Sequence, residues 1–122
     1  MSKLTILITL IILVVVGGLI ILGWNKNSVS AYNTESFAKC LKEKEITMYG
    51  AEWCPHCQNE KKVFGNDFKY IPYVECPDNP RVCINAGIEG YPTWILKDGK
   101  KLVGEQGLEK LSEATGCLLE KK

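Results

Sequence analysis

Charged side chains are almost absent from the first 25 positions of this 122-residue chain, where Lys3 is the only one. From Lys26 onward, 14 basic residues balance 14 acidic residues, and no run of Lys or Arg is longer than two. Because binding to nucleic-acid phosphates needs clustered positive charge, this balance argues against nucleic acid as the main partner. The sequence also has no phosphate-binding loop, no Ser-His-Asp set and no paired carboxylates, so no site of those kinds is expected.

Apolar residues are concentrated at the same end: 17 of the 56 in the chain lie within residues 1–24. Residues 4–22 carry no charge and would span roughly 28 Å as a helix, close to the ~30 Å thickness of the hydrocarbon core of a bilayer. We therefore predict a membrane anchor over 1–24, with Trp24 at the interface. The alternatives are a signal peptide cleaved near residues 29–31 or a buried helix, but a cleavable peptide usually has a shorter apolar region.

The remaining residues are enough for one core but not for two. Residues 25–33 are small and polar and predict a linker, and residues 34–122 form the predicted domain. Hydrophobic periodicity and turn residues predict helices over 34–44, 54–64, 80–86 and 108–115, and strands over 46–49, 73–75, 93–96 and 101–103. Asp98-Gly99 marks a hairpin turn between the last two strands. This order predicts an α/β fold, a small sheet with helices on its faces.

Six cysteines in so small a domain, behind an apolar segment, indicate an oxidising compartment. Cys54-Pro55-His56-Cys57 lies where a predicted strand gives way to a predicted helix. At a helix N-terminus, unpaired N–H groups and the helix dipole favour a thiolate, and His56 adds positive charge. This spacing predicts Cys54 as the nucleophile, Cys57 as the resolving thiol, and Pro55 and His56 as residues that tune the pair.

Two other interpretations of this cysteine pair remain open, a fixed structural disulfide and half of a zinc site. A zinc site would need a second closely spaced pair, but six residues separate Cys76 from Cys83. We therefore predict no metal, and no cofactor other than the redox-active disulfide itself.

Trp53-Cys54-Pro55-His56-Cys57, followed about 35 residues later by Gly90-Tyr91-Pro92-Thr93, resembles the thioredoxin superfamily over nearly the whole domain. The resemblance implies a thioredoxin-like fold and a cis peptide bond before Pro92, beside the reactive sulfurs. It also implies that Trp53, Tyr91, Pro92 and Thr93 contact an extended substrate. Trp94 and Tyr73 are expected in the core.

Residues 48–65, 73–76 and 87–94 are similar, more specifically, to thioredoxin-like domains fused or paired to vitamin K epoxide reductase homologues. That resemblance implies electron exchange with a separate quinone-linked membrane enzyme. One departure from the wider family is Met48, which occupies the position of a buried acid that helps to move the proton of the resolving thiol. Glu52 and Glu60 are near the motif in sequence, but the sequence does not place them.

The four remaining cysteines allow three pairings. The favoured one is Cys76–Cys83, which would close a short loop, with Cys40–Cys117, which would join the two ends of the domain. Cys76 and Cys83 could instead form a second redox relay.

The sequence thus predicts a membrane-anchored thiol–disulfide oxidoreductase that acts on exported proteins, with its domain on the extracytoplasmic side. A reductase or isomerase for exported proteins and a non-catalytic binding domain remain as alternatives. The direction of electron flow, the client proteins and the oligomeric state are left open by the sequence.

Overall fold

The computed structural model describes residues 2–22 and 31–122. The predicted linker lies mostly outside these residues, as do Trp24 and most of the alternative cleavage site at 29–31. The first described element is a helix, α1 (Lys3–Leu22). Within the described part of the chain, no helix combines the length and the apolar character needed to cross a membrane. The membrane-spanning helix predicted over 4–22 is therefore not confirmed.

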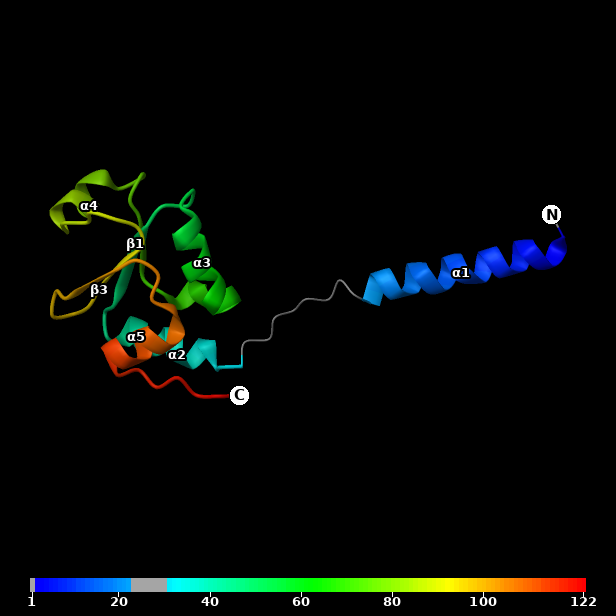
Figure 1. Ribbon diagram of the computed structural model, residues 1–122. Coiled ribbons are helices and arrows are strands. Elements are labelled where there is room, and N and C mark those ends of the chain that lie inside the picture. Colours follow the sequence, from blue (N-terminus) through cyan, green and yellow to red (C-terminus); the bar gives the residue numbers. More distant parts are fainter. Residues whose placement is uncertain (1, 23–30) are drawn as a thin grey trace.

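The domain contains four strands and five further helices, shown in Figure 1. In chain order these are α2 (Thr34–Glu43), β1 (Thr47–Gly50), α3 (Pro55–Phe64), a 3-10 helix η1 (Gly65–Tyr70), β2 (Tyr73–Glu75), α4 (Pro80–Asn85), β3 (Thr93–Ile95), β4 (Lys101–Val103) and α5 (Gly107–Thr115). Every element predicted for this part of the chain is present within one or two residues of its expected bounds. The 3-10 helix was not predicted, because Gly65 was expected to end the helical segment.

The strands form one mixed sheet in the order β2-β1-β3-β4. Strand β1 pairs in parallel with β2 and antiparallel with β3, and β3 pairs antiparallel with β4 across the predicted Asp98-Gly99 turn. Gly99 has φ 84°, a backbone conformation that glycine adopts without steric cost. Figure 1 shows α2 and α5 near one end of the sheet and α4 near the other. The α/β fold is therefore confirmed, with a four-stranded mixed sheet.

Aromatic side chains fill the core between the sheet and the helices. Phe37 of α2 stacks on Phe64 of α3 with 6.0 Å between ring centroids, and Phe64 also packs against Trp94 of β3 at 6.1 Å. Trp94 is fully buried, as expected, but Tyr73 is only half-buried and lies at the margin of the core. The hydroxyl group of Tyr73 can therefore form polar contacts, which are described with the candidate active site below.

Two disulfides cross-link the domain, one between residues far apart in the sequence and one across a short loop. Cys40 of α2 is bonded to Cys117, just beyond α5, with 5.9 Å between the α-carbons. Cys76 is bonded to Cys83 of α4, with 5.7 Å between the α-carbons. The structure therefore has the pairing that the sequence favoured among the three possible ones, and it leaves Cys54 and Cys57 as free thiols.

Candidate active site

The cysteine motif lies in the turn from β1 into α3. Cys54 is the N-cap residue of α3 and has an extended backbone, and its carbonyl accepts the first helical hydrogen bond, from the N–H of Gln58 at 3.1 Å. Pro55 occupies the first position of the helix, where its missing N–H leaves no donor unsatisfied and its fixed φ suits the helix. The sequence therefore places the Cys54 sulfur at the positive end of a ten-residue helix.

The two sulfurs of the motif differ in accessibility. Cys54 retains 6% of its surface exposed, whereas Cys57, on the first turn of α3, is fully buried. Burial is the main reason why the pKa of the Cys57 thiol is raised to about 11, and the neighbouring Cys54 raises it further. Cys54 is therefore the sulfur that another molecule can reach, and Cys57 is held behind it as a thiol.

The loop before β3 faces the reactive sulfur. The Tyr91–Pro92 peptide bond is cis, and the carbonyl oxygen of Tyr91 lies 3.9 Å from the Cys54 sulfur. The hydroxyl group of Thr93 donates a hydrogen bond of 2.7 Å to the carbonyl of Gly90, which ties the two sides of this loop together. The structure thus places the cis bond between Tyr91 and Pro92 beside Cys54, whereas the hydroxyl group of Thr93 bonds within the loop, and substrate binding by these residues stays a prediction.

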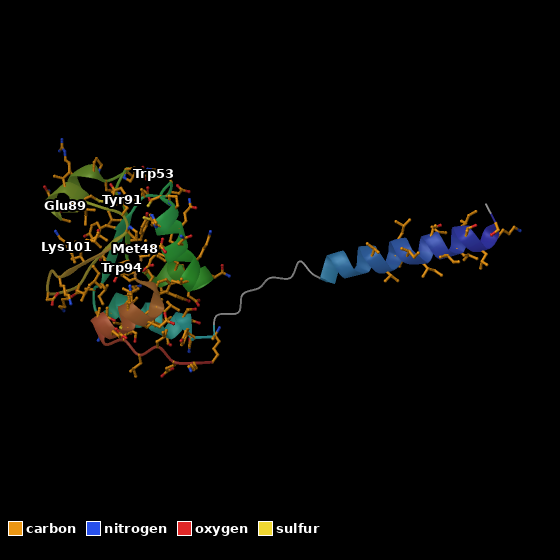
Figure 2. All side chains as sticks on the ribbon, viewed as in Figure 1. Met48, Trp53, Glu89, Tyr91, Trp94 and Lys101 are labelled. Carbon is orange, nitrogen blue, oxygen red and sulfur yellow. A yellow bond between two sulfur atoms is a disulfide. The ribbon has the colours of Figure 1, made fainter. Side chains whose placement is uncertain are left out.

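An aromatic rim borders the same sulfur. Trp53 is 68% exposed, and its ring meets that of Tyr91 edge to face with 6.1 Å between centroids. Figure 2 shows both residues toward the α4 end of the domain, whereas Met48 and Trp94 lie in its interior. An exposed indole beside a nearly buried sulfur gives an apolar surface that suits an extended polypeptide.

His56 is not an isolated loop side chain. Its Nδ1 lies 2.5 Å from Oε1 of Glu105, in the segment that follows β4, and Asn59 donates a 3.2 Å hydrogen bond to the same oxygen. These hydrogen bonds hold the pKa of the Glu105 carboxyl below its ordinary value. Glu105 was missed by the sequence analysis, because 49 positions separate it from His56 and no motif marks it.

Glu60 is a buried carboxylate with only 1% of its surface exposed. It accepts a 2.9 Å hydrogen bond from the indole N–H of Trp94, and both of its oxygens accept from the backbone N–H groups of Gln106 and Gly107 at 3.2–3.3 Å. Burial raises the pKa of Glu60 in spite of these donors. The carboxylate therefore ties α3 to β3 and to the start of α5.

A second acid lies on the other side of the motif, on β2. The hydroxyl group of Tyr73 donates a 2.5 Å hydrogen bond to Oε2 of Glu75, and Oε1 of Glu75 accepts a 2.8 Å hydrogen bond from the backbone N–H of Glu52. Sequence analysis missed this pair, because the two residues are ordinary for a short strand. Among the described residues, no group of three or more His, Cys, Asp or Glu side chains is arranged to hold a metal ion.

A four-stranded mixed sheet, with a Cys-x-x-Cys pair at the start of a helix and a cis-proline opposite, defines a thioredoxin-like domain. The thioredoxin family model matches residues 28–115, and the chain belongs to this family.

Among known proteins, the chain is 44% identical over 94 residues to thiol-disulfide oxidoreductase LTO1 of Arabidopsis thaliana, a match that covers 70% of this chain and 25% of that protein. It is 36% identical over 81 residues to protein disulfide isomerase-like 2-2 of Oryza sativa subsp. japonica, covering 56% of this chain and 22% of that protein. The chain thus matches about a quarter of the length of these relatives. Among solved structures, mitochondrial thioredoxin 3 of Saccharomyces cerevisiae in its oxidised form aligns with 67% of this chain and 87% of its own, at 19% identity and a TM-score of 0.45.

Proposed function

We propose that this protein is a thiol–disulfide oxidoreductase in which Cys54 exchanges disulfides with client proteins and Cys57 resolves the mixed disulfide. The observation that carries the proposal is the asymmetry of the pair. Cys54 lies at a helix N-terminus beside the Tyr91–Pro92 bond with 6% of its surface exposed, whereas Cys57 is fully buried. An accessible sulfur at the positive end of a helix suits attack, and a buried neighbour suits an intramolecular second step.

In the oxidising direction, a client thiolate attacks the Cys54 sulfur of the Cys54–Cys57 disulfide. The bond between the two enzyme sulfurs breaks, a bond between the client and Cys54 forms, and Cys57 leaves as a thiolate that takes up a proton. A second client thiolate then attacks the client sulfur, and Cys54 leaves. The client gains one disulfide and loses two electrons, which the Cys54–Cys57 pair gains. Trp53 and Tyr91 provide apolar contacts for the client backbone beside Pro92.

For the electron partner, we propose a quinone-linked membrane oxidoreductase of the vitamin K epoxide reductase type. The support is the sequence resemblance to thioredoxin-like domains associated with such enzymes, together with Pro55-His56 between the cysteines. A measured reduction potential tests the direction: a value near −120 mV supports an oxidase, and a value near −270 mV supports a reductase instead.

We further propose that residues 4–22 anchor the protein in a membrane, with the domain on the oxidising side. These residues are uncharged, and many apolar side chains of α1 are exposed in the isolated chain. The Cys40–Cys117 and Cys76–Cys83 bonds suit an oxidising compartment. Extraction at alkaline pH tests the anchor: the full chain should remain with the membranes, and its release into the supernatant would contradict the proposal.

The decisive test of the activity is a Cys57→Ser variant expressed in cells that export the domain. Without a resolving thiol, mixed disulfides between Cys54 and client proteins should accumulate and should disappear on reduction. The matched control is the Cys54→Ser, Cys57→Ser double variant, in which no such species should form. If the single variant traps no client under any condition, the domain is a binding module and the enzymatic proposal fails.

A further inference from the structure

The step in which Cys57 resolves a mixed disulfide requires a base. In this chain, the position at which the resemblance places the acidic residue that serves as this base is occupied by Met48. Cys57 must lose its proton before its sulfur can attack the mixed disulfide at Cys54. Burial raises the pKa of the Cys57 thiol well above neutral pH, so this thiol needs a base to form its thiolate. Met48, at the position where the resemblance places a buried acid, is fully buried and cannot accept a proton.

Glu60 is poorly suited to replace that acid. It lies one turn from Cys57 on α3, but both of its oxygens already accept hydrogen bonds from the N–H groups of Gln106 and Gly107, and Oε1 accepts a third from Trp94. These hydrogen bonds direct the Glu60 carboxylate toward β3 and the start of α5 rather than toward Cys57.

The geometry around Gly50, the last residue of β1, points to another group. A β-carbon built on Gly50 would lie 2.7 Å from the Cys57 sulfur and 3.4 Å from the hydroxyl oxygen of Tyr73. The sulfur and this oxygen therefore lie within about 6 Å of each other, on the side of Gly50 where a side chain would project. That separation is within reach of a single bridging water, which is sufficient for proton transfer to a general base.

Tyr73 is already connected to an acceptor. Its hydroxyl group donates to Oε2 of Glu75, and the N–H of Glu52 holds the other oxygen of that carboxylate in place. Burial is the main cause of the raised pKa of Tyr73, and the hydrogen bond to Glu75 is the second cause. The phenol therefore stays protonated and can donate its proton to Glu75 as it accepts another. Lys61 lies 3.9 Å from the centre of the Tyr73 ring, and its charge favours the Cys57 thiolate.

We propose that Tyr73 and Glu75 form the proton relay for Cys57. They would serve in place of the buried acid of related domains, whose position is occupied here by Met48. The inference rests on the proposed function, since it assigns the base for the step in which Cys57 resolves a mixed disulfide at Cys54, as when the reduced pair passes its electrons to a disulfide of a partner. In this step the thiol proton of Cys57 moves to a bridging water as that water gives a proton to the Tyr73 oxygen and the phenol proton moves to Oε2 of Glu75. The Cys57 sulfur then attacks Cys54, the Cys54–Cys57 bond forms, the bond from Cys54 to the bound partner breaks, and the partner sulfur leaves as a thiolate.

The relay can be tested with the full chain in detergent, after selective reduction of Cys54 and Cys57. Reaction with Ellman's reagent should release one thionitrobenzoate when Cys54 forms the mixed disulfide and a second when Cys57 resolves it. The second phase is intramolecular, so its rate should not depend on the concentration of the reagent. Tyr73→Phe and Glu75→Gln should slow this second phase at least tenfold at pH 7 and leave the first phase within twofold, because general-base catalysis contributes about 10²- to 10⁴-fold.

The pH profile separates a relay from a structural role. In Tyr73→Phe, the rate of the second phase should rise about tenfold per pH unit between pH 6 and 9, since hydroxide must then generate the thiolate. The wild-type rate should rise less steeply. The matched control is Tyr70→Phe, which removes another tyrosine-to-glutamate hydrogen bond, from Tyr70 to Glu35 at 3.4 Å, in the exposed η1 segment. It should leave both phases unchanged.

Each outcome bears on one of the two proposals. If Tyr73→Phe resolves the mixed disulfide at the wild-type rate with the wild-type pH profile, the relay is refuted while the proposed function stands. If the wild-type protein forms the mixed disulfide but releases no second thionitrobenzoate, the proposed function itself fails. If Tyr70→Phe slows the second phase as much as Tyr73→Phe does, the effect belongs to the stability of the fold and the relay is also refuted.

Discussion

The two disulfides close loops of very different length, so their removal should destabilise the domain by different amounts. Cys40 and Cys117 are 77 positions apart, and Cys76 and Cys83 only 7. In the chain-entropy treatment, the longer loop stabilises the folded state by about 4.5 kcal/mol at 25 °C and the shorter one by about 2.5 kcal/mol. We therefore expect the Cys40→Ala, Cys117→Ala variant to lose about 2 kcal/mol more than the Cys76→Ala, Cys83→Ala variant.

Comparing the two double variants removes most other contributions. Cys117, Cys76 and Cys83 are each at most 5% exposed and Cys40 is half-buried, so the loss of packing should be broadly similar. Urea unfolding of the full chain, followed by tryptophan fluorescence, gives the free energy of each variant. For a domain of this size, a difference of about 2 kcal/mol corresponds to roughly 8–16 °C in melting temperature.

The order of the two variants is the critical result. The reasoning is refuted if loss of the Cys76–Cys83 bond costs as much as, or more than, loss of the Cys40–Cys117 bond. That outcome would mean that the short bridge acts mainly through the folded state, by holding α4 against the end of β2, and that loop entropy is not the governing term. A Cys54→Ala, Cys57→Ala variant of the same protein provides the reference for cysteine replacement outside a structural bond.

Two other substitutions test the packing around the site. Gly50→Ala would bring a β-carbon to 2.7 Å from the Cys57 sulfur and should destabilise the fold by about 1–3 kcal/mol in urea unfolding. Gly90→Ala, whose β-carbon would meet Val103 at an ordinary 3.6 Å, should cost less, and an equal cost would contradict the steric argument. Burial raises the pKa of Glu60 above its ordinary 4.5, so the folded state binds the proton of this carboxyl group more tightly than the unfolded chain does. The protonated Glu60 therefore contributes its full stability below about pH 4.5, and this contribution falls as the pH rises through the raised pKa. Glu60→Gln should therefore gain stability relative to the wild type as the pH rises above about 4.5. A difference in unfolding free energy that does not vary with pH would be inconsistent with an ionised, buried Glu60.

Much of the fold could be predicted because its signals are local. Pro55 in a first helical turn and Asp98-Gly99 between apolar runs each determine the backbone within a few residues. Helix α2 begins at Thr34 as predicted, but the residue that caps it is Asn33 and not Thr34, which was expected to do so. The Cys54–Cys57 spacing and the Gly90–Thr93 run likewise carry their chemistry in short motifs. The 3-10 helix after Gly65 was missed, because a glycine with positive φ usually ends a helix, and only packing against α2 and α3 favours another helical turn there.

The sequence by itself determined the order of the elements, the cysteine motif at the start of α3 and the facing proline loop, because each depends on neighbours along the chain. Only the tertiary structure decided which acids surround the motif. In the folded structure, Glu105 bonds to His56 and Glu60 bonds to the start of α5. The Tyr73–Glu75 pair lies next to Gly50, on the side where the Cys57 sulfur also lies. Apart from the Tyr73–Glu75 hydrogen bond, which lies within β2, these contacts join residues 23–49 positions apart. They depend on sheet register and side-chain burial, which no local pattern encodes.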